Sequence, residues 1–395
     1  MTVSLLTAGG FLREDEGSVL LRWVMTEPMD YASSGVDINL EGEAVASLIG
    51  SLGVSVRRPG ELGAPVPLPG GFGGVVEFGE NCLALATDGV GSKLQIAIDL
   101  GRLDGVGIDC IAMSVNDLIC VGAEPLAFVD YIAVPETNPA VHAVLGESLS
   151  EGCSRARVTL AGGETATLPG IVKELDLSGT ALGWFPRGRG ITGENLEEGD
   201  VLIGMPSNGI HSNGYSLVRA VLEKEDCSLM DAPPFDPSHP FREVERFGGG
   251  ALTLGEVILN PTRIYVDPLA YLIKECLAGE GVCSHGSIKA LAHITGGGLA
   301  NLLRLHDSLG WHISDPLPPH PEFGWISEAG SISNKEMHRT FNMGMGMVVA
   351  ISSRDSVAVE EWLASRMPGC RVVGEVVSNG SKVTHADPEV VFSNY

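Results

Sequence analysis

The stretch Thr87-Asp88-Gly89-Val90-Gly91-Ser92-Lys93 follows an apolar run, residues 82–86, which is typical of a buried strand. An acid, two glycines and a lysine directly after a strand suit the binding of a metal-bound phosphate. The Asp88 carboxylate can hold Mg²⁺, the backbone N–H groups near Gly89 and Gly91 can approach phosphate oxygens, and Lys93 supplies positive charge. A tight turn with Lys93 on the surface fits these residues equally well, and the GxxxxGK[ST] spacing of a Walker A loop is absent.

Length and composition indicate a two-domain α/β enzyme. The chain has 395 residues, whereas single cores rarely grow beyond about 250–300 residues. Hydrophobic residues make up 44% and there are 52 glycines, which favours a compact, loop-rich protein over a disordered one. Fifty acids against 25 bases give a formal charge of −25, which argues against nucleic-acid and anionic-membrane partners and leaves a high-salt cytoplasm as one explanation of the acidity.

The cysteines and the N-terminus favour a cytoplasmic protein. The eight cysteines contain no CxxC pair and mostly lie in apolar surroundings, so we expect buried free thiols. No stretch is long and apolar enough to span a membrane, and the acids at 14–16 argue against a signal peptide. Residues 1–28 are expected to be a disordered extension, with Met1, Met25 or Met29 as the true start.

The hydrophobic pattern divides the rest of the chain into two domains, 29–196 and 197–378, and a tail, 379–395. The pattern predicts helices over residues 41–51, 104–121, 139–153, 216–223, 260–276, 299–305 and 357–366. It predicts strands over residues 82–86, 126–134, 158–161, 177–185, 201–205 and 288–294, and one that ends at 351. Residues 227–250 have the composition of a surface loop.

Polar residues in the first half suggest a Mg-ATP site. In the helix 104–121, Asp109 and Asn116 share a face, roughly 10 Å apart, and Asp117 lies beside Asn116. The strand 158–161 runs into Gly162-Gly163-Glu164-Thr165, so two strand ends deliver glycine and an acid. With the helix acids they form a credible multi-carboxylate site, although a solvated helix face is the alternative.

Polar residues in the second half suggest anion binding. Ser212 and Asn213 precede a helix whose free N–H groups can bind an anion, and His211 can donate to a phosphate, shuttle a proton or be structural. Arg263 is placed for a phosphate. Thr295-Gly296-Gly297-Gly298 forms another strand–glycine–helix junction.

Ten motifs, in one order, resemble the phosphoribosylformylglycinamidine cyclo-ligase family (AIR synthetases, PurM). They span most of residues 29–378 and comprise YASSGVDI (31–38), GGFGG (70–74), TDGVGSK (87–93), GIDCIAMSVNDL (107–118), GAEPLAFVDYIA (122–133), GGETATLPG (162–170), HSNGYSLVR (211–219), NPTRIYV (260–266), AHITGGG (292–298) and FNMGMGM (341–347). The resemblance implies an α/β, PurM-like two-domain fold of the α+β kind. An N-terminal mixed-sheet domain, which pairs through its sheet in a homodimer, precedes a C-terminal α/β domain.

The resemblance also implies a reaction: ATP-dependent cyclisation of formylglycinamidine ribonucleotide to aminoimidazole ribonucleotide, with release of ADP and phosphate, in purine biosynthesis. ATP and Mg²⁺ are the implied cofactors, and the ribonucleotide is the implied small-molecule partner. ATP phosphorylates the formyl amide oxygen, an amidine nitrogen attacks that carbon, and phosphate leaves.

Carried over position by position, the family motifs assign roles to single residues. The implied metal ligands are Asp88, Asp109, Asp117 and Glu164, and the implied catalytic residues are Asp88, Lys93 and His211. The implied nucleotide contacts are Gly73, Gly89, Gly91, Asn116, Gly163 and Thr165. The implied ribonucleotide contacts are Ser212, Asn213, Arg263, Thr295, Gly296 and Gly297.

The sequence departs from the family pattern at Thr167-Leu168, where an acid and a methionine often stand, and it has no lysine before Lys93, which leaves Arg57 or Arg58 as cations near the N-terminal arm. Alternatives with the same plan are formylglycinamidine ribonucleotide synthetase, selenophosphate synthetase and a hydrogenase maturation factor. The last two need an N-terminal-arm or C-terminal cysteine, whereas the first cysteine is Cys82 and the chain ends in Tyr395. A non-catalytic ATP-binding paralogue is a further alternative, although the implied site residues are present.

Overall fold

The computed structural model describes residues 29–30, 43–45, 47–48, 57–68, 72–243 and 252–395. Predictions for the extension 1–28, the start methionine, the arm 31–38 and Gly70-Gly71 lie outside these residues. Residues 43–45 and 47–48 are helical, in agreement with the predicted helix 41–51.

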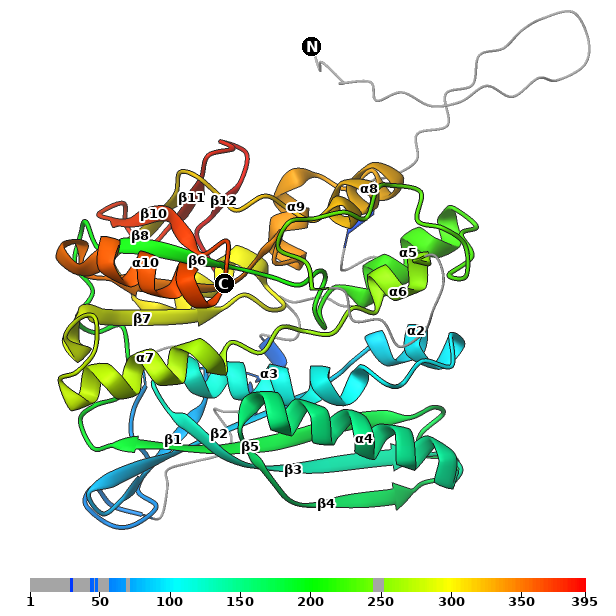
Figure 1. The fold of residues 1–395 in the computed structure, drawn as a ribbon, viewed down its shortest axis with the longest axis horizontal. Helices are drawn as coiled ribbons and strands as arrows, with labels where there is room; N and C mark the ends of the chain where they lie inside the picture. Colours follow the sequence, from blue (N-terminus) through cyan, green and yellow to red (C-terminus); the bar gives the residue numbers. More distant parts are fainter. Residues whose placement is uncertain (1–28, 31–42, 46, 49–56, 69–71, 244–251) are drawn as a thin grey trace, which may run out of the picture.

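The N-terminal domain is built on a five-stranded sheet in the order β1-β2-β5-β3-β4 (Figure 1). Only β3 and β4 pair in parallel, so the sheet is mixed, as predicted. The strands are β1 (Gly74–Phe78), β2 (Asn81–Gly89), β3 (Glu124–Val134), β4 (Thr159–Thr167) and β5 (Asp176–Pro186).

One face of this sheet carries the helices. These are α2 (Lys93–Asp99), α3 (Val106–Cys120) and α4 (Pro139–Ala156). Asn138 caps α4 by accepting the Ala140 N–H at 3.0 Å, as the sequence predicts. In α3 every residue but Asp117 is buried, because this helix packs on the sheet, on α4 and on the C-terminal domain. Gly107 permits the close contact with α4, since a Cβ there would overlap the Leu149 backbone.

The other face of the sheet has no labelled helix on it among the described residues (Figure 1). Apolar side chains from β2 and β3 are exposed there, with 39–42% of their surface accessible: Leu85, Leu126, Val129 and Tyr131. A group of exposed apolar side chains on one face often marks a surface that binds another molecule.

The C-terminal domain contains a seven-stranded sheet in the order β12-β11-β8-β10-β6-β9-β7. Its strands are β6 (Val201–Pro206), β7 (Ile288–His293), β8 (Gly310–Ile313), β9 (Met345–Ile351), β10 (Arg371–Val377), β11 (Val383–His385) and β12 (Val391–Phe392). Because β11 pairs with β8 and β12 pairs with β11, the sheet extends beyond residue 378, and the predicted tail is part of the domain.

Helices surround this sheet and form a separate apolar cluster beside it. The helical elements are α5 (Tyr215–Lys224), α6 (Leu254–Ile258), α7 (Val266–Ala278), η1 (His285–Ser287), η2 (Gly298–Leu305), α8 (Pro321–Gly330), α9 (Asn334–Thr340), η3 (Ser353–Asp355) and α10 (Ser356–Arg366). Residues of α5, α6, α8 and α9 pack together with Ile96 of α2, so this cluster joins both domains.

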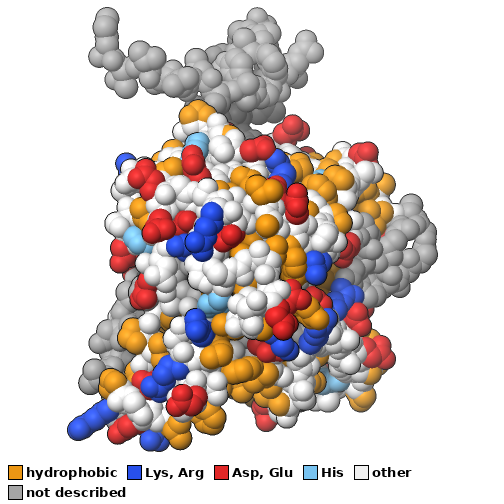
Figure 2. Space-filling view, turned by 60° about the vertical axis from the view of Figure 1, so that its left-hand side comes forward, with side chains coloured by type: hydrophobic (Ala, Val, Ile, Leu, Met, Phe, Trp, Pro, Cys, Tyr) orange, Lys and Arg blue, Asp and Glu red, His pale blue; other side chains and the backbone are white. Residues whose placement is uncertain are grey.

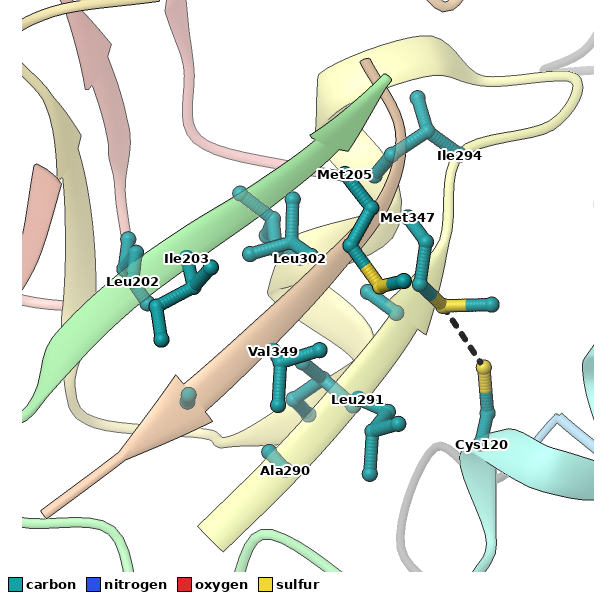
Figure 3. Close-up of a cluster of buried hydrophobic side chains, with 14 of the residues drawn as sticks. Cys120, Leu202, Ile203, Met205, Ala290, Leu291, Ile294, Leu302, Met347 and Val349 are labelled. Carbon is teal, nitrogen blue, oxygen red and sulfur yellow. Dashed lines mark hydrogen bonds between the residues drawn. The ribbon is translucent and has the colours of Figure 1, made fainter. Parts of the chain in front are cut away.

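The core of the C-terminal sheet reaches the end of α3 (Figure 3). Cys120 Sγ lies 3.7 Å from the sulfur of Met347 in β9, and Met205 of β6 is buried beside it. The methionines of the 341–347 motif at positions 345 and 347 are therefore core residues. Six of the eight free cysteines are buried, which also agrees with the sequence analysis.

The described helices include none that is long and apolar enough to cross a membrane. Figure 2 shows acidic and basic side chains interspersed over the face that it displays, without a continuous basic band. Nucleic-acid binding usually relies on clustered Lys and Arg side chains, and this face does not present such a cluster.

Candidate active site

The two domains meet along the polar side chains of α3 and the loop 260–265. Asp109 Oδ1 accepts the backbone N–H of Thr262 at 2.7 Å, and Asn116 Oδ1 accepts that of Tyr265 at 2.8 Å. Asn116 Nδ2 donates to the Arg263 carbonyl at 2.9 Å. The predicted helix 260–276 consequently begins only at Val266, because side chains of α3 satisfy backbone groups that a helix would otherwise pair.

Lys93 and Asp109 form an ion pair at this seam. Lys93 Nζ lies 2.8 Å from Asp109 Oδ2 and donates to Oδ1 at 2.9 Å, and both side chains are fully buried. Lys93 also donates to the Asn260 carbonyl at 3.0 Å. The sequence analysis assigned Lys93 to phosphate and Asp109 to a metal ion. In the structure each charge is bonded to the other and shielded from solvent, and the two ligand contacts stay predictions.

A hydrogen-bond chain continues from this pair to the 211–213 motif. Thr262 Oγ1 donates to Asp109 Oδ1 at 2.6 Å and lies 3.0 Å from Ser212 Oγ. The Ser212 side chain is therefore hydrogen-bonded to Thr262 at the interface between the domains. Its predicted ribonucleotide contact stays a prediction.

Asp88, at the end of β2, and Asp117, in α3, are partly accessible acids. Asp117 accepts from His293 Nδ1 at 2.9 Å, and 21% of its side chain is exposed. The pKa of Asp88 is raised to about 6; burial is the main cause and the charge of Asp117 contributes, while the Gly89 N–H and His293 act in the opposite direction. Of the four predicted metal ligands, the structure brings these two together.

Glu164 lies elsewhere. The strand predicted to end at 161 continues to Thr167, so Glu164 is inside the edge strand β4 and not at its end. The register places Asp88 opposite Gly179, Gly179 opposite Asp130 and Asp130 opposite Gly163. Because side chains alternate along a strand, Glu164 points to the face opposite that of Asp88.

The four predicted metal ligands therefore do not form one site within one copy. The described residues contain no group of three or more His, Cys, Asp or Glu side chains that could hold a metal ion. Thr165 is also in the edge strand β4 and is exposed, but it alternates with Glu164 and therefore lies on the face that carries Gly163, Asp130 and Asp88.

Asp130 is a site candidate that the sequence analysis missed. It stands in the same row as Asp88, and its carboxylate covers Gly163, where a Cβ would overlap it. Burial raises its pKa. The sequence feature that could have indicated it is an acid within the otherwise apolar predicted strand 126–134. His293, in the AHITGGG motif, is a second such residue, and its bond to Asp117 could be seen only in three dimensions.

His211 is buried and has one unpaired nitrogen. Its Nε2 accepts the backbone N–H of Asn208 at 3.1 Å, while Nδ1 has no partner. Burial lowers the pKa of His211 well below its usual range, and the nearby charges of Lys93 and Arg263 act in the same direction. The ring is therefore neutral and carries its proton on Nδ1. It can donate one hydrogen bond to a ligand, which suits polarisation better than proton transfer.

The glycines of the 341–347 motif make room for His211, as their predicted close packing implies. A Cβ on Gly346 would lie 2.6 Å from His211 Cε1 and would overlap the Tyr265 hydroxyl. Any side chain at 346 would displace the histidine.

The glycine loop 296–298 meets the 211–213 motif. A Cβ on Gly296 would lie 3.2 Å from Asn213 Oδ1, and Gly297, with φ of 92°, precedes η2. Thr295 accepts the Gly298 N–H at 2.9 Å. Two predicted anion-binding loops, far apart in the sequence, are thus neighbours.

The remaining predicted nucleotide glycines lie near the ends of β2. Gly73 precedes β1 and packs against the Leu85 carbonyl, three residues before Asp88. Gly89 is the last residue of β2, and Gly91 adopts a φ of 68° in the turn to α2. The loop form predicted around Asp88 is therefore present, although the lysine that follows it points into the protein.

Comparison with known proteins identifies the family. Residues 70–185 match the family profile described as AIR synthase related protein, N-terminal domain, and residues 197–386 match the corresponding C-terminal domain. A phosphoribosylformylglycinamidine cyclo-ligase of Methanosarcina acetivorans is 42% identical over 355 residues, which cover 90% of this chain and 97% of the relative. The chain belongs to the phosphoribosylformylglycinamidine cyclo-ligase family.

Other cyclo-ligases are similar over comparable lengths. The Methanobrevibacter smithii protein is 40% identical over 365 residues, covering 90% of this chain and 99% of the relative. The chloroplastic Arabidopsis thaliana protein is 40% identical over 365 residues, covering 91% and 84%. The cyclo-ligase family is therefore matched over both domains.

Solved structures at low identity share the fold. A thiamine-monophosphate kinase from Stenotrophomonas maltophilia aligns with a TM-score of 0.56 at 16% identity, covering 90% of this chain and 97% of the kinase. Hydrogenase maturation protein HypE in complex with ATP aligns with a TM-score of 0.53 at 14% identity, covering 85% of each chain. The two-domain α/β fold predicted for this cyclo-ligase family member is confirmed.

Proposed function

We propose that this protein catalyses the ATP-dependent ring closure of formylglycinamidine ribonucleotide to aminoimidazole ribonucleotide, with release of ADP and phosphate. The observation that carries the proposal is the 42% identity to a curated cyclo-ligase over 97% of that relative's length. Asp88, Asp117 and His211 are present at the matching motifs and are gathered at the domain seam.

Asp88 and Asp117 would hold the magnesium ion that accompanies ATP. Mg²⁺ is usually bound through one or two carboxylates together with substrate phosphates, so a pair of neighbouring carboxylates fits it. A cation here would also offset the repulsion from Asp117 that raises the pKa of Asp88. When bound, the ion would neutralise charge on the transferring phosphoryl group.

The protein would otherwise contribute orientation and hydrogen bonding. The Nδ1–H of His211 is directed away from its backbone partner and would donate to an oxygen on the substrate as negative charge develops there. Arg263 and the 296–298 loop would orient the ribonucleotide. Phosphoryl transfer of this kind depends mainly on positioning and electrostatics.

The direct test uses purified full-length protein with Mg-ATP and formylglycinamidine ribonucleotide, following aminoimidazole ribonucleotide and ADP together. We expect equal amounts of both products. ATP binding or hydrolysis without the cyclised product would contradict the proposal and would favour a different ATP-dependent enzyme of this fold.

We further propose that two copies pair through the open face of the N-terminal sheet, and that the protein works in the cytoplasm. The exposed side chains of Leu85, Leu126, Val129 and Tyr131 would be buried between the two sheets. Removing such apolar area from water stabilises an assembly by roughly 25 cal/mol per Å² before the costs of association.

Replacing Val129 with aspartate should break this dimer. Two carboxylates would meet near a two-fold axis without partners, and we expect dimer affinity to fall at least about 100-fold. Light scattering after gel filtration measures the change. Val357→Asp is the control, since Val357 is 65% exposed on α10. A wild-type protein that is monomeric at micromolar concentration, or a dimer that Val129→Asp leaves intact, would contradict the pairing.

A further inference from the structure

The segment 239–243, which the sequence analysis assigned to a surface loop, is docked on the ribonucleotide side of the site. The Phe241 carbonyl accepts from Arg263 Nη2 at 2.8 Å, and the Glu243 N–H donates to Asn208 Oδ1 at 2.7 Å. Asn260 Nδ2 donates to the Glu243 carbonyl at 3.1 Å. Three hydrogen bonds thus fix the backbone on both sides of Arg242.

Arg242 itself points inward and is held by Glu322. Its side chain is 2% exposed and that of Glu322 is fully buried; Nη2 of the arginine donates to Glu322 Oε2 and lies 3.3 Å from His320 Nδ1. His320 Nε2 lies 3.1 Å from the Ser207 carbonyl. These contacts place the guanidinium beside the loop 207–211, which also carries His211.

The polar atoms without partners around this loop are mostly donors. Among the described residues they are Nε and Nη1 of Arg242, Nε of Arg263, Nδ1 of His211, Nε2 of His239, Oγ of Ser207 and Oε1 of Glu322. A buried donor that lacks a partner is costly and calls for an explanation. The buried groups, two guanidiniums and the Glu322 carboxylate, carry a net positive charge of one, and the one other carboxylate paired with them among the described residues is that of Glu243, which is 79% exposed and lies 3.8 Å from Arg263 Nη2. The buried set is therefore suited to an anion.

We propose that Arg242 binds the phosphate monoester of the ribonucleotide substrate together with Arg263, and that Glu322 positions Arg242 for it. This inference rests on the proposed function, in which the substrate carries such a group. An arginine is suited to the task, because its planar donors can hold two phosphate oxygens while a third donor stays on the carboxylate.

Arg242→Gln tests the proposal kinetically. Losing charge-assisted hydrogen bonds should raise the KM for formylglycinamidine ribonucleotide roughly 10- to 100-fold, with the KM for ATP changed less than about twofold. Arg155→Gln, which removes an exposed arginine paired with Glu151 on α4, is the matched control and should change neither constant. An unchanged KM for the ribonucleotide, or a rise in the KM for ATP alone, would overturn the proposal.

A binding measurement separates this inference from the proposed reaction, because it needs no turnover. By calorimetry, the wild-type protein should bind ribose 5-phosphate at least about tenfold more tightly than ribose, and Arg242→Gln should remove that difference. If Arg242→Gln does not fold, Arg242→Lys retains the pair with Glu322 and should give an intermediate preference. A wild-type protein with no preference for the phosphorylated sugar would overturn the assignment.

Discussion

Replacing Asp88 with asparagine is expected to reduce turnover about a thousand-fold or more while leaving the fold intact, because the variant loses a carboxylate proposed to carry the cation that neutralises the transferring phosphoryl group. The amide is nearly isosteric and can still accept the Gly89 N–H, which Asp88 Oδ1 accepts at 2.7 Å. Steady-state kinetics and thermal unfolding on the same preparation measure both effects. Asp99→Asn, at the exposed end of α2, is the control.

The pH dependence of Mg-ATP binding sharpens this prediction. The pKa of Asp88 is raised to about 6, so below that pH the folded protein must release a proton to bind the cation. Affinity should therefore fall by up to about tenfold per pH unit below pH 6. Calorimetry on Asp88→Asn reports the titration of the nucleotide alone, and the difference between the two proteins isolates Asp88.

The same shift fixes the sign of the effect on stability. A carboxyl whose pKa is raised by folding contributes stability below its unfolded pKa of 3.8, and this contribution is lost as the pH rises through about 6. The ionised Asp88 thus lowers the free energy of unfolding of the unliganded protein at pH 8. At that pH Asp88→Asn should be at least as stable as the wild-type protein. A variant that unfolds, or that retains wild-type turnover, would remove Asp88 from the catalytic site.

Lys93→Met is expected to destabilise the protein by about 3–5 kcal/mol, because it leaves the Asp109 carboxylate buried without its cation. The sequence alone predicts a different outcome for the loss of Lys93, namely weaker ATP binding. Denaturant unfolding followed by tryptophan fluorescence, with Lys274→Met as the exposed control on α7, distinguishes the two.

A double variant tests whether the pair, rather than the lysine alone, is responsible. Lys93→Met with Asp109→Asn removes both charges and keeps an oxygen that can accept from Thr262, so we expect it to recover much of the stability lost in Lys93→Met. Nucleotide affinity that falls in a fully stable Lys93→Met protein would show that the lysine acts on ATP after all.

Sequence reasoning located most elements of the fold because their signals are local. The Asn138-Pro139 cap, the apolar period of α3 and the alternation of β5 each depend on neighbouring residues. The loop 260–265 was assigned to a helix because nothing local shows that its N–H groups are bonded to Asp109 and Asn116, about 150 residues earlier.

The sequence predicted which residues belong to the candidate site but not which of them contact one another. Lys93 and Asp109 are separated by sixteen residues, and a pattern of charges cannot show whether they face a ligand or one another. Glu164 was misplaced because a strand longer by several residues moves an acid from the end of a sheet to its middle and fixes which face it occupies. Arg242 belongs to no motif, and only its burial against Glu322 reveals it.

The sharing of α3 between the two domains has a mechanical consequence. Rotating one domain away from the other would expose the Lys93–Asp109 pair to solvent and would strip Asn116 from the loop that it holds. A hinge motion between the domains would have to break all of these bonds at once, so we expect the two domains to move as one rigid unit. The distance from Asp88 and Asp117 to the donors around His211 is therefore set when the chain folds. The site is already arranged before a substrate binds.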